Sequence, residues 1–333
     1  SVNPARSTSA VPSSDPPSIT MCSATPRGWS RTDAMHRARN PPWFMVGVTM
    51  ESKGATREVK HRSSPSAIPS DPMIAPIARH RTYIARTAWR DVRHRHVGSV
   101  GGAAWNVLRP LALIAVFTIV FGQIMTQRGS GEFEGIRFTL YLCAALLPWS
   151  AFAEVVGRST HALVGGAPYL RKLAIEEEVF IAQGAVSAAI SLAISFGLLT
   201  VLALALGLSP AWTWLLAPIP MALLMLVGLG VGTALGTVFV FVRDIKHLVE
   251  IALHVGFWTV PIVYDPAIVP AWFQKTFPFN PVHPFLEAVR SLFLRGVVPP
   301  WDQWAVMLAW TVASLALGQV VLSRLRSQVR DNL

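Results

Sequence analysis

The chain has 333 residues, of which 52% are apolar and 14% are charged, and its formal net charge is +11. Soluble domains usually carry about 25% charged residues, so this composition excludes disorder as the main state and argues against an ordinary cytosolic enzyme. It indicates a membrane protein. The two cysteines, Cys22 and Cys143, lie in a Ser/Pro-rich stretch and in an apolar run, and they predict neither a disulfide framework nor a metal site.

Residues 1–82 contain eleven prolines, many Ser and Arg residues, and no sustained periodicity. This composition is typical of disorder, and we expect a disordered tail here. The stretch lacks the order of basic, apolar and cleavage regions that marks a signal peptide. Because Met73 and four earlier methionines follow Ser1, a start site assigned too far upstream is an alternative, and a transit peptide is a weaker one.

An amphipathic helix is predicted over residues 83–97. Ile84, Ala88 and Val92 recur at a spacing of four and form an apolar stripe, while arginines occupy other faces. Such a helix lies in the membrane interface, with arginines toward anionic head groups and an aromatic ring at the boundary. The residues assigned to this interface helix are Trp89, Arg90, Asp91 and Arg93. The alternative is a plain basic flank, which needs the arginines but not the stripe.

Uncharged runs long enough to cross a bilayer follow. A span needs about 20 residues, and residues 179–242 form a run of 64 residues without a formal charge, so this run must hold two helices. A Gly-Leu-Ser-Pro turn at residues 207–210 separates them. The sequence therefore predicts an all-α polytopic membrane protein with six transmembrane helices, at residues 107–126, 137–158, 179–206, 213–242, 248–264 and 303–323.

The distribution of Lys and Arg predicts the orientation of these spans. If both termini are cytoplasmic, the cytoplasmic flanks hold twelve Lys and Arg and the external flanks hold five. Basic residues are enriched on the cytoplasmic side of membrane proteins. We therefore expect both termini to be cytoplasmic.

The second cytoplasmic loop, residues 161–180, carries a candidate docking segment. Gly165, Gly166 and Pro168 are expected to break the second helix and to leave a short exposed helix with apolar and basic faces. The residues expected to contact a cytosolic partner are Tyr169, Leu170, Arg171 and Lys172. Three glutamates at residues 176–178 then suit the start of the third helix, where the dipole favours negative charge. The alternative is a solvated turn with helix-capping acids.

The segments on either side of the fifth span carry two more candidate sites. Arg243 and Asp244 form an adjacent pair of opposite charge, which anchors a helix end, links cytoplasmic loops or only sets topology. Residues 265–302 contain seven prolines and many aromatic residues. This favours an external re-entrant hairpin of two half-inserted helices separated by Asn280 and Pro281. A Trp and Phe interfacial belt is the overlapping alternative.

Residues that the sequence lacks also limit its chemistry. No ionisable residue lies deep in a predicted span, since Glu154 and Glu250 fall near predicted cytoplasmic ends, and this argues against ion-coupled transport and ion-selective pores. No Gly-Lys dipeptide occurs, so the chain cannot bind ATP through a P-loop of the form G-x-x-x-x-G-K-[ST]. It also contains none of the common catalytic or metal-binding motifs. Any energy for transport is therefore expected from elsewhere.

Taken in chain order, these features resemble the ABC-2 type permeases, especially the branch that exports polysaccharides such as O-antigen and teichoic acid. The resemblance covers about residues 83–330. The matching positions are Trp89-Arg90-Asp91, Gly101, Trp105 and Pro110 around the first span; Tyr141 to Leu147, Trp149 and Phe152 in the second; Leu170-Arg171-Lys172; Arg243-Asp244-Ile245; and Pro261, Tyr264, Asn280-Pro281 and Arg290.

The resemblance implies a half-transporter of the bacterial inner membrane. Two copies of the chain would form the pathway for a lipid-linked polysaccharide, in contact with membrane lipids. Two copies of a separate ABC ATPase, which hold the ATP and Mg²⁺, would dock on residues 169–172. The resemblance implies no cofactor in this chain and no nucleic-acid partner. The residues it assigns to the pathway or gate are Tyr141, Trp149, Phe152, Trp258, Pro261, Tyr264, Asn280 and Pro281.

Three other functions remain open on the sequence. A permease of the same type that moves a drug or hydrophobic lipid shares the architecture, and the neighbouring genes would distinguish it. An intramembrane glycan-modifying enzyme needs convergent polar residues in or beside the spans, which the sequence does not offer. A structural membrane subunit needs neither the aromatic hairpin nor the long cytoplasmic loop.

Overall fold

The computed structural model describes residues 74–94, 104–127, 132–170, 176–264, 266 and 269–332, which belong to one compact unit, Ala67–Leu333. These residues form helices and connecting turns, and no strand occurs among them. The prediction of disorder up to residue 82 is wrong for its last residues, because α2 (Ile74–Arg79) and the start of α3 (Arg81–His94) are helical there. Residues 1–73 lie outside the described part of the chain.

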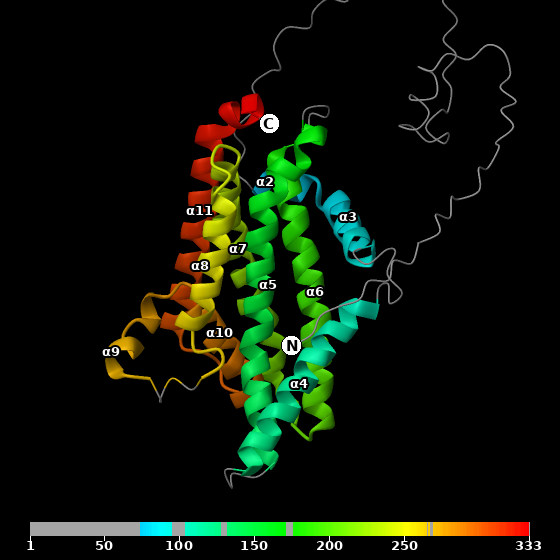
Figure 1. Cartoon of the computed structure of the whole chain (residues 1–333), viewed down its shortest axis with the longest axis vertical. Coiled ribbons are helices and arrows are strands. Elements are labelled where there is room, and N and C mark those ends of the chain that lie inside the picture. The colour runs from blue at the N-terminus through cyan, green and yellow to red at the C-terminus, as the bar shows by residue number, and fades with distance from the viewer. Residues whose placement is uncertain are drawn as a thin grey trace, which may run out of the picture. The chain divides into compact units, whose positions relative to one another are not determined.

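Long helices run alongside one another and make the body of this unit (Figure 1). They are α4 (Trp105–Gln127), α5 (Glu132–Leu170), α6 (Glu177–Ala205), α7 (Pro218–Phe239), α8 (Ile245–Thr259) and α11 (Trp301–Asn332). Short helical pieces fill the connections: η3 (Trp212–Leu216), α9 (Ala271–Gln274), η5 (Phe277–Phe279), α10 (His283–Arg290) and the π-helical η6 (Ser291–Arg295). The predicted turn at residues 207–210 is present, and Gly207 supplies its positive φ of 82°.

Four stretches of the described residues are long and apolar enough to cross a membrane. They are Arg137–Pro168, Glu177–Ala205, Trp212–Phe239 and Trp301–Asn332. The predicted first span falls in α4, where the apolar stretch found is the shorter Pro110–Val120. The predicted fifth span falls on α8, whose 15 residues are fewer than the roughly 20 that a span needs. The count of six spans therefore stays a prediction.

The second span is longer than the sequence indicated. Gly165, Gly166 and Pro168 do not break it, because α5 continues through all three and ends at Leu170. Glycine lowers helix stability by roughly 1 kcal/mol relative to alanine, but packing on α6 compensates here: a Cβ at Gly166 would lie 3.3 Å from the ring of Phe180. Long apolar helices tolerate internal proline when neighbouring helices support the backbone. Tyr169 and Leu170 therefore belong to α5 and not to a separate short helix, while the rest of the predicted helix at residues 169–172 lies outside the described residues.

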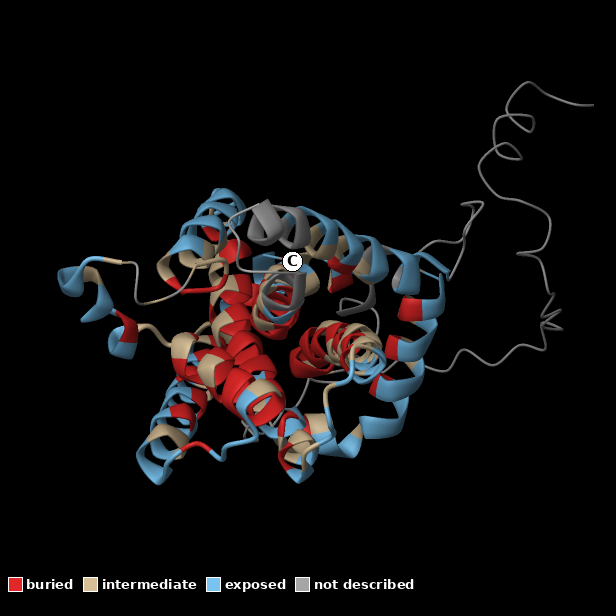
Figure 2. Cartoon of the chain, turned by 90° about the horizontal axis from the view of Figure 1, so that it is seen from below, coloured by how far each residue is buried: buried red, intermediate tan, exposed pale blue. Residues whose placement is uncertain are grey.

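Glycines bring the central helices into backbone contact. A Cβ at Gly230 of α7 would lie 2.4 Å from the backbone of Ser314 in α11, and a Cβ at Gly318 would lie 2.6 Å from the carbonyl oxygen of Gly230. On the other side of α7, a Cβ at Gly232 would lie 2.5 Å from the Cβ of Ser159 in α5. Small residues are the usual contact in membrane bundles. The α7 glycines therefore let both neighbouring helices approach closely, and Figure 2 shows buried residues gathered on the central helices.

The predicted amphipathic helix is α3, and its apolar stripe packs on protein. Its buried residues are Ile84, Ala88 and Val92, as the spacing predicted. The stripe lies against the first turns of α6, where Ile84 shares a core cluster with Val179 and Ala182. The arginines at residues 86, 90 and 93 are exposed. The placement of α3 in a membrane interface stays a prediction.

Candidate functional sites at the two ends of the bundle

The C-terminal end of the bundle is the end where α5 and α11 finish and α6 and α8 begin (Figure 1). Glu176 immediately precedes α6 there, and its carboxylate is 3.1 Å from Nη1 of Arg79 and 3.2 Å from Nε2 of His80. These two residues lie at the junction of α2 and α3. Glu176 therefore joins the start of α6 to the N-terminal helices.

The next two glutamates join α6 to the C-terminal helix. Glu177 and Glu178 are 0% and 1% exposed. Oε1 of Glu177 accepts a hydrogen bond of 2.6 Å from Nε of Arg330, and Oε1 of Glu178 is paired with Nη2 of Arg326. Burial of a carboxylate costs several kcal/mol, on the order of a whole protein's stability, unless the ion is paired. The arginines of α11 therefore make this burial possible.

The capping interpretation of these glutamates is therefore wrong. Glu176 occupies the N-cap position but makes no side-chain cap hydrogen bond. Glu177 and Glu178 lie in the first turn of α6, where the helix dipole favours negative charge, but exposed glutamates would satisfy the dipole equally well. The dipole therefore does not explain why these two side chains are buried. Their arginine partners are 148 and 153 residues further along the chain. No local pattern in the sequence could have identified these pairs.

Two of the predicted docking residues lie at this same end. Tyr169 and Leu170 are the last two residues of α5, while Arg171 and Lys172 lie outside the described residues. The pair Arg243 and Asp244 forms the exposed turn between α7 and α8. The Arg243 guanidinium lies 5.5 Å from the centre of the Phe239 ring, and within the described part of the chain neither member of the pair forms an ion pair.

A second charged cluster joins α3 to α5 and α6. Asp91 accepts hydrogen bonds from Nη1 of Arg158 at 2.8 Å and from Oγ of Ser187 at 2.6 Å. Nε of Arg158 is also 3.1 Å from Glu154. Because α5 continues to Leu170, Glu154 lies near the middle of the stretch Arg137–Pro168, which is long and apolar enough to cross a membrane. Its place near the cytoplasmic end of the span stays a prediction. Charged residues within a membrane bundle require such partners.

The hairpin end of the bundle is the opposite end, where α8 stops and α9 and α10 follow (Figure 1). Asn280 separates η5 from α10, as predicted. Its amide Nδ2 donates to Oγ1 of Thr259 at 3.1 Å, and its Oδ1 accepts from the N–H of Val282 at 3.0 Å. Asn280 therefore holds the hairpin to the last residue of α8. Insertion of the hairpin into a membrane stays a prediction.

Arg290 is the largest fully buried side chain at this end, at 1% exposure. Its Nε donates to the carbonyl of Tyr141 at 3.1 Å, Nη1 donates to that of Pro261 at 2.6 Å, and Nη2 donates to that of Ile262 at 2.9 Å. Its guanidinium also lies 3.6 Å from the centre of the Tyr141 ring. The chain after Thr259 is not helical, so the carbonyls of Pro261 and Ile262 receive their hydrogen bonds from Arg290 in place of helical N–H groups.

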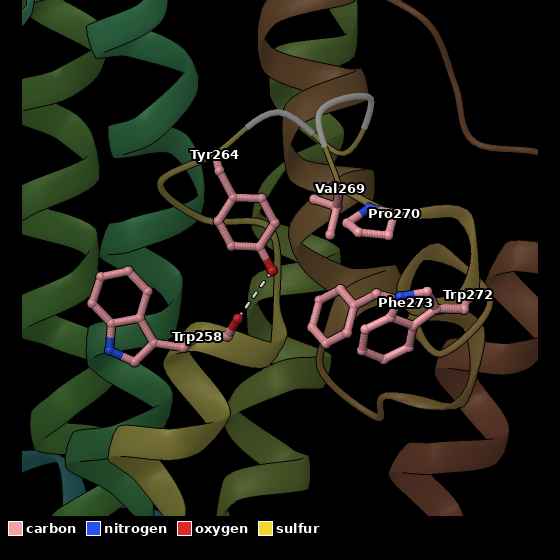
Figure 3. A pocket seen from close by; sticks show the side chains of 6 residues that line it. All are labelled: Trp258, Tyr264, Val269, Pro270, Trp272 and Phe273. Carbon is pink, nitrogen blue, oxygen red and sulfur yellow. Dashed lines mark hydrogen bonds between the residues drawn. The ribbon is translucent and has the colours of Figure 1, made fainter.

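The aromatic residues predicted for a pathway separate into a buried and an exposed group. Trp149 and Phe152 are core residues, and the Trp149 ring lies 5.6 Å from that of Phe152 and 6.2 Å from that of Phe257. Trp258 is 54% exposed and lines a cavity of about 390 Å³. Figure 3 shows this cavity between Tyr264 on one side and Trp272 and Phe273 on the other. The Tyr264 hydroxyl donates to the Trp258 carbonyl at 3.0 Å.

Sequence reasoning found Tyr141, Pro261 and Arg290 separately but missed that they meet. It counted Arg290 among the basic residues of the external flanks and among the positions that match the family, but did not expect it to be buried. The available signal was an arginine that directly follows the apolar residues Ala288 and Val289 in α10, because a buried guanidinium must satisfy its donors. Which carbonyls it would satisfy depends on where α8 ends, and that depends on packing.

The bundle of long apolar helices, with charged residues paired inside it, defines a polytopic helical membrane protein. A family comparison then identifies its kind. Residues 84–294 match the model of the ABC-2 type transporter family. The chain belongs to this family and is therefore a transporter subunit and an integral membrane protein.

Curated relatives cover much of the chain. An O-antigen export system permease protein RfbA from Klebsiella pneumoniae is 22% identical over 210 residues, which are 63% of this chain and 79% of the relative. The protein of the same name from Myxococcus xanthus is 21% identical over 263 residues, which are 78% of this chain and 99% of the relative. The similarity is low in identity but extends over most of the fold.

Proposed function

We propose that the chain is the permease subunit of an ATP-driven exporter that moves a lipid-linked polysaccharide across the bacterial inner membrane. The observation that carries the proposal is the similarity to O-antigen export permeases over 78% of this chain and 99% of one relative. Local sequence motifs are too weak to support this alone. In this proposal both termini are cytoplasmic, so the C-terminal end of the bundle faces the cytoplasm.

The ATPase is a separate subunit in this proposal, present in two copies that hold the ATP and Mg²⁺. The absence of a Gly-Lys dipeptide supports it, because the chain then has no P-loop of its own. The ATPase docks at residues 169–172, beside the end of α5. Arg243 and Asp244 lie in a turn at the same end of the bundle, where they are available to contact it.

A homodimer is supported by the surface of α8. Val249 is the only residue of this helix that is fully buried in the chain. Exposed polar residues lie along it at His247, Glu250 and His254, and exposed apolar residues lie beside them. Ionisable side chains in membrane helices normally face protein or a water-filled cavity. A second copy of the chain covers the apolar part in this proposal, and the polar part lines the path for the glycan.

The experiment is a deletion of the gene, with complementation by the wild-type chain carrying an affinity tag. We expect the deletion strain to lose surface glycan and to accumulate lipid-linked glycan on the cytoplasmic side. We expect the tagged permease to co-purify with a P-loop ATPase. Normal surface glycan in the deletion strain would reject the polysaccharide substrate, and altered efflux of a drug or lipid would then favour the alternative permease.

A further inference from the structure

The start of α6 holds three consecutive glutamates with three different sets of partners. Glu176 contacts Arg79 and His80 at the α2–α3 junction. The next two residues reach α11: Glu177 contacts Arg330 and Arg326, with the Nε of Arg326 at 3.5 Å, and Glu178 contacts Arg326. We call these three residues the glutamate cluster. It connects the α2–α3 junction and α11 to the first turn of α6.

The glutamate cluster lies close in sequence to the proposed docking segment, so it can pass on a movement of that segment. Glu176 follows Lys172, the last proposed docking residue, by four positions. Any displacement of the docking segment therefore reaches the bundle along two covalent routes, α5 on one side and the first turn of α6 on the other. On the α6 side, among the residues that the structure describes, the first side chains with partners elsewhere in the bundle are those of the cluster.

The contact continues from the cluster into the centre of the bundle. Arg326 and Arg330 belong to the same helix as Ser314 and Gly318. These two residues touch the backbone of Gly230 in α7 so closely that no side chain fits between the helices. A helix held by ion pairs at one end and by backbone contact in its middle moves largely as a rigid rod. Packed interiors transmit such displacements because they do not compress.

We infer that Glu177 and Glu178 are positioning residues that transmit movement of the ATPase docking segment to α11, and through α11 to α7. This inference rests on the proposed function. Ion pairs suit the role because they fix distance and direction between two helices, whereas apolar contacts permit sliding. Helix capping does not explain the arrangement, since neither capping nor the dipole requires arginines on another helix.

The test uses charge reversal and its repair in the full chain. The variants are Glu177→Arg, Arg330→Glu and the double variant that carries both. We expect each single variant to co-purify with the ATPase within twofold of wild type, while surface glycan falls at least tenfold. The double variant restores the pair in reverse and is expected to recover at least a third of the wild-type export. Arg324→Glu is the matched control, because Arg324 is exposed on the same helix and forms no ion pair within the described residues.

A milder pair of substitutions protects the test against misfolding. Glu177→Gln with Glu178→Gln keeps the shape and removes the charge, and it serves if a reversal fails to insert. Normal export in this variant would overturn the inference, and so would loss of ATPase binding together with export in every variant. Hydrogen exchange of the last turns of α11 in purified permease is expected to rise at least tenfold in the Gln variant. That measurement needs no ATPase, so unchanged exchange refutes the positioning role even if the proposed transport function is wrong.

Discussion

The two ends of the bundle hold their arginines in opposite ways. At the C-terminal end, Arg326 and Arg330 pair with carboxylates of another helix. At the hairpin end, Arg290 donates instead to three backbone carbonyls, from α5 and from the chain just after α8. The first arrangement joins two complete helices. The second satisfies backbone groups where a helix has stopped, so it permits irregular structure inside an apolar bundle.

The difference determines how each end responds to mutation. An ion pair has two side chains, so its charges can be exchanged and the contact rebuilt. The partners of Arg290 are backbone groups that no substitution can replace, so loss of Arg290 cannot be repaired from the other side. Mutations at the hairpin end are therefore expected to lower the stability of the protein more, and mutations at the C-terminal end to weaken the coupling to the ATPase more.

The largest effect is expected from Arg290→Ala. Each buried carbonyl left without a donor costs about 1–3 kcal/mol. The carbonyls of Pro261 and Ile262 lose their donor here, and the hydrogen bond to Tyr141 and the stacking on its ring are lost as well. We expect the variant to fall to low levels in the membrane and to melt at lower temperature in detergent. Arg290→Lys should rescue only in part, because one ammonium cannot reproduce the planar fork of a guanidinium.

Arg295→Ala is the control for that experiment. Arg295 lies on the adjoining η6 and pairs with Glu287, but its side chain is 53% exposed. Exposed ion pairs contribute about 0–1 kcal/mol, so we expect near-normal melting. An equal fall in membrane level and melting temperature in Arg290→Ala and Arg295→Ala would contradict a special role for the buried guanidinium.

At the C-terminal end, replacement of Tyr169 and Leu170 by Asp should uncouple the transporter. Both residues finish α5 beyond the last residue of the span, Pro168, so insertion should be unaffected. An apolar anchor that enters a partner pocket carries much of the binding energy, and we expect ATPase co-purification to fall at least tenfold while glycan accumulates inside. Measurement requires a pull-down beside a surface-glycan assay. Normal values in both would reject a docking role for Tyr169 and Leu170.

The sequence predicted what depends on local pattern. The apolar stripe of α3, the turn at Gly207 and the break at Asn280 were all found, because spacing and turn chemistry are local properties. It failed where long-range packing decides. Gly166 was predicted to break α5, but the ring of Phe180 packs against it and the helix continues.

The charged residues show the same limit. Glu177 reads as a capping acid from its position, and only the fold reveals Arg330 beside it. Arg290 reads as an external flank until the end of α8 is known. In both cases the partner lies far along the chain. The sequence could therefore indicate which residues belong to the site, but not which residues they contact. The predicted pathway residues Trp149 and Phe152 are buried within one chain, and their role in transport stays a prediction.

A smaller effect is expected midway between the two ends, at Gly230. Gly230→Ala places a methyl group 2.4 Å from the backbone of Ser314, so α7 and α11 must separate. Overpacking of this kind costs about 1–3 kcal/mol. Gly197→Ala on α6 is the control, because no atom lies within 4 Å of its Cβ, and helix propensity alone predicts a gain of about 0.5–1 kcal/mol. Thermal melting should move in opposite directions for the two variants.

The smallest effect is expected from substitutions on α3, which packs against the first turns of α6. Arg90 and Arg93 are exposed, while Asp91 between them is held by Arg158 and Ser187. Reversal of both arginines to Glu should therefore leave α3 in place and remove only attraction to anionic lipid, about 1 kcal/mol per residue. In vesicles with and without anionic lipid, we expect the double variant to lose export several-fold only in the anionic ones. Unchanged export in both vesicles would reduce the arginines to a topology signal, whereas equal loss in both would show that they act through protein contacts.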